Sequence, residues 1–275
     1  MNKLDSKKQA HVVAALVEGC SIRSTVRMTG VAKNTISKLL VELGAACADY
    51  LDKNLVNLNS KRIQCDEIWQ FVGAKQKNLP PAKLDQLGIG DVWTWVAIDA
   101  DSKLICSWLV GKRDPGCATE FIQDLAGRLR NRVQLTTHGL KMYLTAVADG
   151  FGEDIDYAML IKVYGNDPEG EKRYSPAICT SCEKKTVAGD PDPKHINTSY
   201  IERQNLTMRM GMRRFTRLTN AFSKKIENHV AAIALHYMHY NFCRIHQTLR
   251  VTPAMQAGVA NHVWSIQELI GLLAE

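Results

Sequence analysis

Length, composition and charge describe an ordinary folded protein. The chain has 275 residues, of which 45% are hydrophobic and 23% charged, and this balance excludes a disordered or fibrous chain. The formal net charge of +7 only slightly favours a polyanionic partner. No stretch approaches the roughly 18 uninterrupted apolar residues of a membrane-spanning helix, and the first residues, MNKLDSKKQA, lack the apolar core of a signal peptide. We therefore expect a cytoplasmic protein with no membrane partner.

The first 50 residues have helical periodicity and are predicted to form a helix-turn-helix domain. Gly30 separates two short amphipathic helices, a spacing that is typical of helix-turn-helix modules and equally of a plain three-helix bundle. In a recognition helix, short polar and cationic side chains near the N-terminus meet base edges and phosphates in the major groove. The residues predicted to do so are Lys33, Asn34, Thr35, Ser37 and Lys38.

The rest of the chain alternates strand and helix patterns. After a linker at 51–60, residues 61–250 are predicted to form a catalytic core, and residues 251–275 a helical tail. Within the core, three strand patterns come first, then helix, strand, helix and strand, then a Pro- and Gly-rich inserted loop at 165–198 and a long helical stretch. This element order is that of the α/β ribonuclease-H-like fold, a mixed sheet with flanking helices. Fold alone does not assign a function.

Two acidic residues fall where that fold places metal-binding carboxylates. Asp66 lies within the predicted central strand, where a carboxylate is costly unless it binds something. Glu202 opens the long predicted helix, which Ser199 could cap, although the helix dipole alone also favours an acid in a first turn. Gly211 is a possible break in this helix. If the helix is continuous, a basic stripe follows Glu202 along one face. The basic residues predicted to contact DNA phosphates are Arg203, Arg209, Arg213, Arg214, Arg217 and Lys224.

Cysteine and tryptophan give weaker signals. The eight cysteines are mostly isolated in apolar stretches, which indicates reduced thiols. Cys179 and Cys182 form a CxxC pair that, with His195, could be part of a zinc site, but free thiols are the favoured interpretation. The tryptophans indicate core packing more than base stacking. They are Trp69, Trp93, Trp95, Trp108 and Trp264.

Three runs carry a specific resemblance: CDEIWQFVG, TSYIERQNLTMRMGMRRFTRLTNAFSKKIENH and YNFCRIHQTLRVTPAM. In these runs, and over nearly the whole chain, the sequence resembles transposases of the first-described family of bacterial insertion sequences, insertion sequence one. The resemblance implies a DNA transposase with an Asp-Asp-Glu triad and magnesium, acting on double-stranded DNA at terminal inverted repeats and at a target. It also implies a homodimer or higher synaptic assembly at the bacterial nucleoid. The first acid corresponds to Asp66 and the last to Glu202.

The second acidic position departs from the family pattern. In LTTHGLKMYL the position holds His138 instead of Asp. Mg²⁺ prefers oxygen ligands, whereas Mn²⁺ tolerates imidazole better. We therefore expect Asp66, His138 and Glu202 to form the catalytic and metal site, with impaired strand cleavage and transfer. One alternative is a catalytically silent, transposase-derived DNA-binding protein. Another, a ribonuclease-H-type nuclease without transposition, explains the acids but leaves the helix-turn-helix unexplained.

Overall fold

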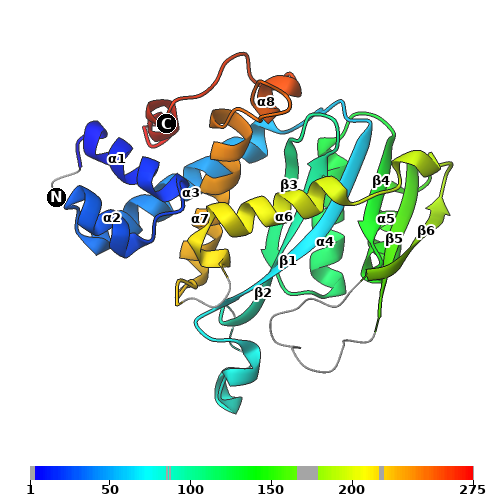
Figure 1. Cartoon of the computed structure of the whole chain (residues 1–275), viewed down its shortest axis with the longest axis horizontal. Helices are drawn as coiled ribbons and strands as arrows, with labels where there is room; N and C mark the ends of the chain where they lie inside the picture. Colours follow the sequence, from blue (N-terminus) through cyan, green and yellow to red (C-terminus); the bar gives the residue numbers. More distant parts are fainter. Residues whose placement is uncertain (1–3, 85, 87, 166–178, 217–219, 275) are drawn as a thin grey trace.

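A six-stranded mixed sheet lies between helices on both of its faces, with further helices at the N-terminal side (Figure 1). The computed structural model describes residues 4–84, 86, 88–165, 179–216 and 220–274. The strands are β1 (Arg62–Val72), β2 (Gly90–Asp99), β3 (Ile105–Gly111), β4 (Val133–His138), β5 (Ile155–Tyr164) and β6 (Cys179–Ala188).

The strand order is β3-β2-β1-β4-β5-β6. The pairs β1–β2 and β2–β3 are antiparallel, β1–β4 and β4–β5 are parallel, and β5–β6 is antiparallel. A three-stranded meander followed by two strands parallel to the first is the ribonuclease-H-like arrangement, so the predicted fold class is confirmed. The strand β1 lies inside the sheet, which confirms the predicted position of Asp66.

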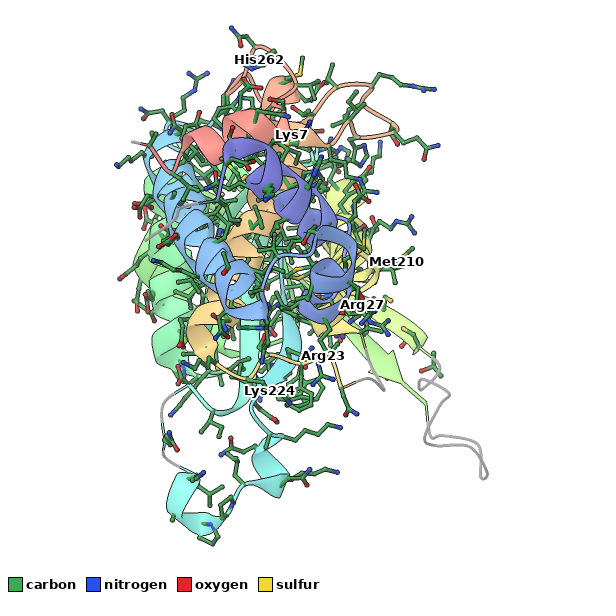
Figure 2. The ribbon with its side chains drawn as sticks, turned by 90° about the vertical axis from the view of Figure 1, so that its left-hand side faces the viewer. Lys7, Arg23, Arg27, Met210, Lys224 and His262 are labelled. Carbon is green, nitrogen blue, oxygen red and sulfur yellow. The ribbon has the colours of Figure 1, made fainter. Side chains whose placement is uncertain are left out.

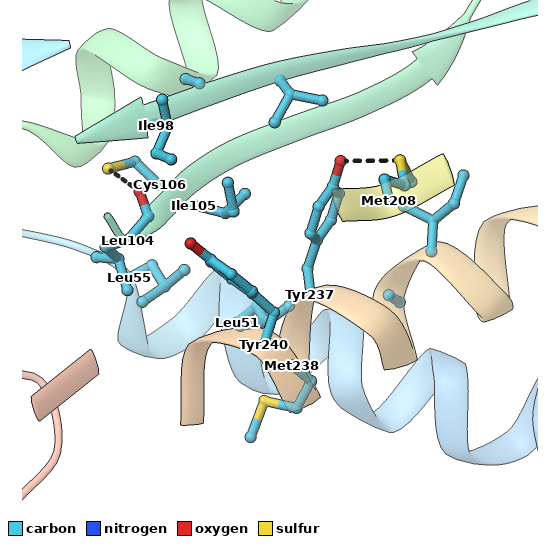
Figure 3. Packing of buried hydrophobic residues seen from close by; sticks show 14 of the residues in the cluster. Leu51, Leu55, Ile98, Leu104, Ile105, Cys106, Met208, Tyr237, Met238 and Tyr240 are labelled. Atoms are coloured by element: carbon cyan, nitrogen blue, oxygen red, sulfur yellow. Dashed lines mark hydrogen bonds between the residues drawn. The ribbon is translucent and has the colours of Figure 1, made fainter. Parts of the chain in front are cut away.

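Different helices cover the two faces of the sheet. On one face, α4 (Pro115–Arg128) and α5 (Met142–Phe151) pack on the buried Trp95, whose ring contacts Phe121 and Tyr143. On the other face lie α6 (Ser199–Gly211) and α7 (Ile226–Met238). The Tyr237 hydroxyl of α7 donates to Sδ of Met208 in α6 at 3.5 Å, as Figure 3 shows. These contacts fix α6 over the central strand.

Three helices precede the sheet: α1 (Ser6–Val17), α2 (Ile22–Thr29) and α3 (Lys33–Asn54). Gly30 joins the last two with φ +70°, a left-handed conformation that glycine adopts without strain. The helix α3 packs closely on α7, because a Cβ on Gly44 would lie 2.5 Å from backbone atoms of Ala231. The side chains of α3 belong to the same buried cluster as the sheet.

The segment expected to be a linker at 51–60 is largely part of the packed structure. The helix α3 continues to Asn54, and Leu55 and Leu58 are buried. Their burial keeps this segment against the core, because apolar side chains leave water when a packing surface is available. At the C-terminal side, a π-helical turn (His239–Cys243) follows α7 and leads to α8 (Pro253–Gln256) and α9 (Ile266–Gly271).

One expectation about secondary structure is wrong. The predicted loop at 165–198 contains the strand β6, which pairs with β5, while residues 166–178 of that loop lie outside the described residues. The helical stretch after Ser199 is interrupted at Gly211, the possible break in the sequence, because Met212 is extended and buried and a short 3₁₀ turn (Arg213–Phe215) follows. Across the described ranges, no helix combines the length and apolar character needed to cross a membrane.

Candidate active site

Three side chains from distant parts of the chain meet at the end of β4. His138 is the last residue of β4, and its Nε2 lies 3.6 Å from Oδ2 of Asp66 and 3.5 Å from Oε1 of Glu202. The pairing of β1 with β4 ends at Cys65 opposite Thr137. Asp66 therefore stands just past the region paired with β4, where β1 is paired with β2 alone. The three predicted catalytic residues come together as the sequence suggested.

The three residues line a pocket of about 750 Å³. Its wall also carries an acidic side chain and three basic ones: Glu67, Arg113, Lys141 and Lys162. A pocket with several cations and carboxylates can hold a phosphate group beside charged side chains. Electrostatic interactions with that phosphate are stronger there than in bulk water.

A glutamine on β1 holds the helix that carries Glu202. Gln64 Oε1 accepts hydrogen bonds from the backbone N–H groups of Tyr200, at 2.9 Å, and of Ile201, at 3.1 Å. These are unpaired donors of the first turn of α6, which a side-chain acceptor normally satisfies. The predicted cap at Ser199 is therefore wrong: α6 begins at Ser199 after Thr198, and the strand supplies the acceptor. Because Gln64 lies two residues before Asp66, β1 positions both acids.

Burial and a hydrogen bond from one side-chain amide determine the pKa of Asp66. The Nδ2 group of Asn205 on α6 donates to Oδ2 of Asp66 at 2.7 Å. Burial, reinforced by the negative charge of Glu202, raises the pKa of Asp66 to about 6, although the hydrogen bond from Asn205 opposes this. Near neutral pH a fraction of this carboxyl is therefore protonated.

A lysine of β5 neutralises Glu202. Nζ of Lys162 lies 2.6 Å from Oε1 of Glu202, and the Thr198 hydroxyl donates to the same oxygen. Burial alone would raise the pKa of Glu202, but these two hydrogen bonds outweigh it and hold the pKa below its usual value. Sequence reasoning missed Lys162, because one lysine in a strand gives no functional signal.

His138 is favoured in its neutral form. Burial lowers its pKa, and the nearby ammonium of Lys162 lowers it further, against the opposing effect of Glu202. The distances from Nε2 to the two carboxylates, 3.6 and 3.5 Å, exceed those of good hydrogen bonds. The ring therefore lies between the two acids in van der Waals contact.

This donor set does not fit magnesium. Mg²⁺ requires near-octahedral oxygen ligation, whereas Oδ2 of Asp66 is bonded by Asn205 and Oε1 of Glu202 by Lys162 and Thr198. The third position offers a nitrogen. Within the part of the chain that the structure describes, no group of three His, Cys, Asp or Glu residues is arranged to hold a metal ion.

Glu67 and Arg113 form the opposite wall of the pocket. Nε and Nη2 of Arg113 both lie 3.1 Å from Oε2 of the buried Glu67. Burial raises the pKa of Glu67, and the neighbouring Asp66 adds to this, while Arg113 opposes it. The guanidinium of Arg113 also lies 4.7 Å from the centre of the Trp93 ring. The sequence alone did not single out this pair.

The predicted recognition residues lie at the exposed start of α3. Lys33, Asn34, Thr35 and Lys38 are exposed and Ser37 is partly so, with Lys38 3.5 Å from Glu42. Two arginines of α2, Arg23 and Arg27, are also exposed, on the face of the molecule seen in Figure 2. They are one helical turn apart and were not predicted. Both helices thus present cations beside the turn at Gly30.

The predicted basic stripe after Glu202 is only partly present. Arg203 is exposed on α6, and Arg209 is partly buried, with Nη1 3.5 Å from the carbonyl oxygen of Phe215. Beyond the end of α6 the stripe is broken. Arg213 and Lys224 are exposed on separate segments, and Arg217 lies outside the described residues.

Arg214 is partly buried and bonded within the protein. It donates to the Ser223 hydroxyl at 2.9 Å, its backbone carbonyl accepts from Gln70, and burial lowers its pKa to about 10. These contacts give Arg214 a structural role, and its contact with DNA stays a prediction.

The cysteine pair gathers no further ligand in the described structure. Cys179 and Cys182 lie exposed on β6 with their sulfurs 3.7 Å apart. His195 turns elsewhere, since its ring contacts Arg62 and Asp192. All eight cysteines are free thiols.

Comparisons with known proteins find weak likeness in structure. No family model matches the chain, and no curated protein matches it. Among solved structures, a piggyBac transposase synaptic complex with hairpin DNA is 12% identical, with a TM-score of 0.42 over 99% of this chain and 71% of that one. A Mos1 transposase paired-end complex is 12% identical, with a TM-score of 0.25 over 57% of this chain and 60% of that one. The Mos1 strand transfer complex is 10% identical, with a TM-score of 0.25 over 86% and 76%.

Proposed function

We propose that the chain is a DNA transposase whose catalytic centre is Asp66, His138 and Glu202, and whose strand cleavage and transfer are impaired by His138. The convergence of these three side chains at one pocket supports the proposal. They come from β1, β4 and α6, as the resemblance to insertion sequence one transposases implies. A purely structural role would not require two partly exposed acids to meet at a cationic pocket.

The DNA-binding part of the proposal rests on the N-terminal helices. The start of α3 exposes Lys33, Asn34 and Thr35, and α2 adds Arg23 and Arg27. Such a surface matches a recognition helix in the major groove with neighbouring phosphate contacts. We propose that it binds the terminal inverted repeats of an element. Because two ends must be held together, we also propose a homodimer or higher assembly.

The pocket's own charges favour binding of a phosphodiester. Lys141, Lys162 and Arg113 lie on its wall and can stabilise the negative charge of a phosphate that enters. At position 138 the site has a ring nitrogen in place of an oxygen donor. An aspartate there would supply an oxygen, would replace a neutral ring by a charge, and would match the family pattern.

A second candidate function is DNA binding without chemistry. It is favoured by the ion pair between Lys162 and Glu202 and by the imidazole between the acids. With these groups in place, the carboxylates are satisfied by protein partners. Such a protein would bind element ends and leave them uncut.

A strand-transfer assay with paired, pre-cut element ends separates the two candidates. We expect His138→Asp to form at least about tenfold more product than the parent in Mg²⁺, since metal-site changes commonly cost that much. The double variant His138→Asp/Glu202→Gln is the matched control and should form none. If neither the parent nor His138→Asp forms product, position 138 is not the second acid; if both form product to the same extent, His138 does not impair the site.

A further inference from the structure

Aromatic side chains form a row along the outer part of β1. Trp69 and Phe71 are two residues apart and lie on the same face of the strand, with ring centroids 5.9 Å apart. Phe222, from the segment before α7, lies 4.6 Å from Phe71, because an isolated bridge pairs Val72 with Ser223. Trp69, Phe71 and Phe222, here called the aromatic row, are all partly exposed. Core packing, which the sequence suggested for the tryptophans, describes the buried Trp95 but not Trp69.

The aromatic row begins at the wall of the candidate active site. Glu67, which lines the pocket, precedes Trp69 by two residues on the same face of β1. The cross-strand partner of Trp69 is Trp93, which Arg113 covers while it bonds Glu67. A continuous series of contacts therefore leads from the pocket to the row.

Cations stand beside the rings. Nζ of Lys75 lies 5.7 Å from the centre of Trp69 and 5.9 Å from that of Phe71. Nζ of Lys224 lies 3.1 Å from the centre of Phe222, and Figure 2 shows Lys224 on the same side of the molecule as Arg23. Asp91 on β2, the cross-strand partner of Phe71, accepts from the backbone N–H of Gln76 at 2.9 Å. These two lysines outnumber this one carboxylate, so the net charge of the three groups is positive.

Partly exposed rings flanked by lysines are the features that bind unpaired nucleic acid. Every base has a flat face that stacks on an aromatic ring, while cations attract the connecting phosphates. Burial alone would not explain the lysines, because an apolar docking surface for another protein is depleted of lysine. Charge complementarity thus favours a polyanion with flat apolar groups.

We propose that the aromatic row, with Lys75 and Lys224, binds a short unpaired stretch of DNA strand that leads out of the active-site pocket. The inference rests on the proposed function and adds to it the form of the DNA at the site. A strand that has separated from its partner would stack its bases on Trp69 and Phe71 and place phosphates near the two lysines. The surface would then act on single strands, whereas α3 reads duplex DNA.

Fluorescence anisotropy with a labelled oligothymidine tests the proposal on the full chain. We expect Trp69→Leu to weaken binding by about tenfold, which corresponds to the loss of one stacked base. The matched control is Trp264→Leu, because Trp264 is also partly buried but packs on Tyr50 and Phe242 elsewhere. It should change the dissociation constant little. Thermal melting establishes that both variants fold.

Photocrosslinking provides a readout that needs no variant. An oligonucleotide that carries 5-iododeoxyuridine should crosslink to peptides that contain Trp69, Phe71 or Phe222. Crosslinks confined to other regions, or equal affinity of parent and Trp69→Leu, would overturn the proposal. A third result would also overturn it: Trp69→Leu changes its oligomeric state, measured by light scattering, while its oligonucleotide binding is unchanged. The aromatic row would then be an interface between copies of the chain. Duplex end binding and strand transfer, measured separately, show whether the proposed function itself fails.

Discussion

Nζ of Lys162 lies 2.6 Å from Oε1 of Glu202 and places a protein cation on one of the two acids of the candidate site. The parallel pairing of β4 with β5 sets His138 opposite Leu160, two residues before Lys162. The lysine therefore reaches the same pocket from the neighbouring strand. Its positive charge already balances the negative charge of Glu202, which weakens the attraction of this carboxylate for another cation.

Removal of this ammonium should change the titration of Glu202. We expect Lys162→Gln to raise the pKa of Glu202, because burial then acts without the opposing hydrogen bond. Carboxyl-selective NMR titration measures the change. Lys162→Arg keeps a cation and serves as the control, with a smaller shift. An unchanged pKa in Lys162→Gln would mean that Thr198 alone stabilises the ionised form.

The partly buried Asp66 should make stability depend on pH. Its pKa is raised from 3.8 to about 6 in the fold, so its protonated form stabilises the fold, fully below the lower value and progressively less as pH rises through the higher one. Asp66→Asn should therefore raise the free energy of unfolding near pH 7 by roughly 1–3 kcal/mol, with almost no effect near pH 4. Urea unfolding of parent and variant at both pH values checks this. A constant difference between the two proteins at all pH values would contradict it.

The start of α3 should contribute to the salt dependence of DNA binding. We expect Lys33→Gln to weaken duplex binding and to reduce the slope of log affinity against log salt by about one, as for loss of one phosphate contact. Lys53→Gln is the matched control, because Lys53 is exposed near the other end of the same helix. Equal slopes for the two variants would place the duplex elsewhere.

Close contact between α3 and α7 should make Gly44 intolerant of a side chain. A Cβ there would lie 2.5 Å from Ala231 backbone atoms, so Gly44→Ala should lower the free energy of unfolding by about 1–3 kcal/mol. Gly127→Ala is the control, since Gly127 lies in α4 with nothing within 4 Å of a built Cβ. That change should be neutral or stabilising, by up to about 1 kcal/mol. If Gly44→Ala were as stable as the parent, α3 and α7 would have to separate easily.

Apolar periodicity was enough to predict the first five strands and the helices between them. The strand β6 could not be predicted in this way, because its residues are exposed except for Ala188, which is partly so, and an edge strand of that kind has no apolar alternation. Its identity depends on backbone pairing with β5. Gly211 was only a possible break in the sequence, because the end of α6 depends on the inward packing of Met212 and Phe215, which helical composition does not reveal.

In the candidate site, too, some residues could be predicted from the sequence and others only from the fold. Residue type and position pointed to Asp66 and Glu202, because acids within a strand or at a helix start are conspicuous, whereas His138 came only from the family resemblance. Partners such as Lys162 and Gln64 emerge only when β5, β1 and α6 are placed together. Arg214 differs in the other direction, since basic composition suggested an exposed side chain and the fold partly buries it.

The helix α3 runs without interruption from Lys33 to Asn54, a span of about 33 Å at 1.5 Å per residue. Its contact with α7 at Gly44 prevents it from swinging as a tethered arm would. If the exposed first turn of α3 binds duplex DNA, as proposed above, the bound base pairs lie at a fixed position relative to Asp66, because α3 cannot move independently of α7. The spacing between the bound sequence and the catalytic centre would then be set by the packing of these two helices.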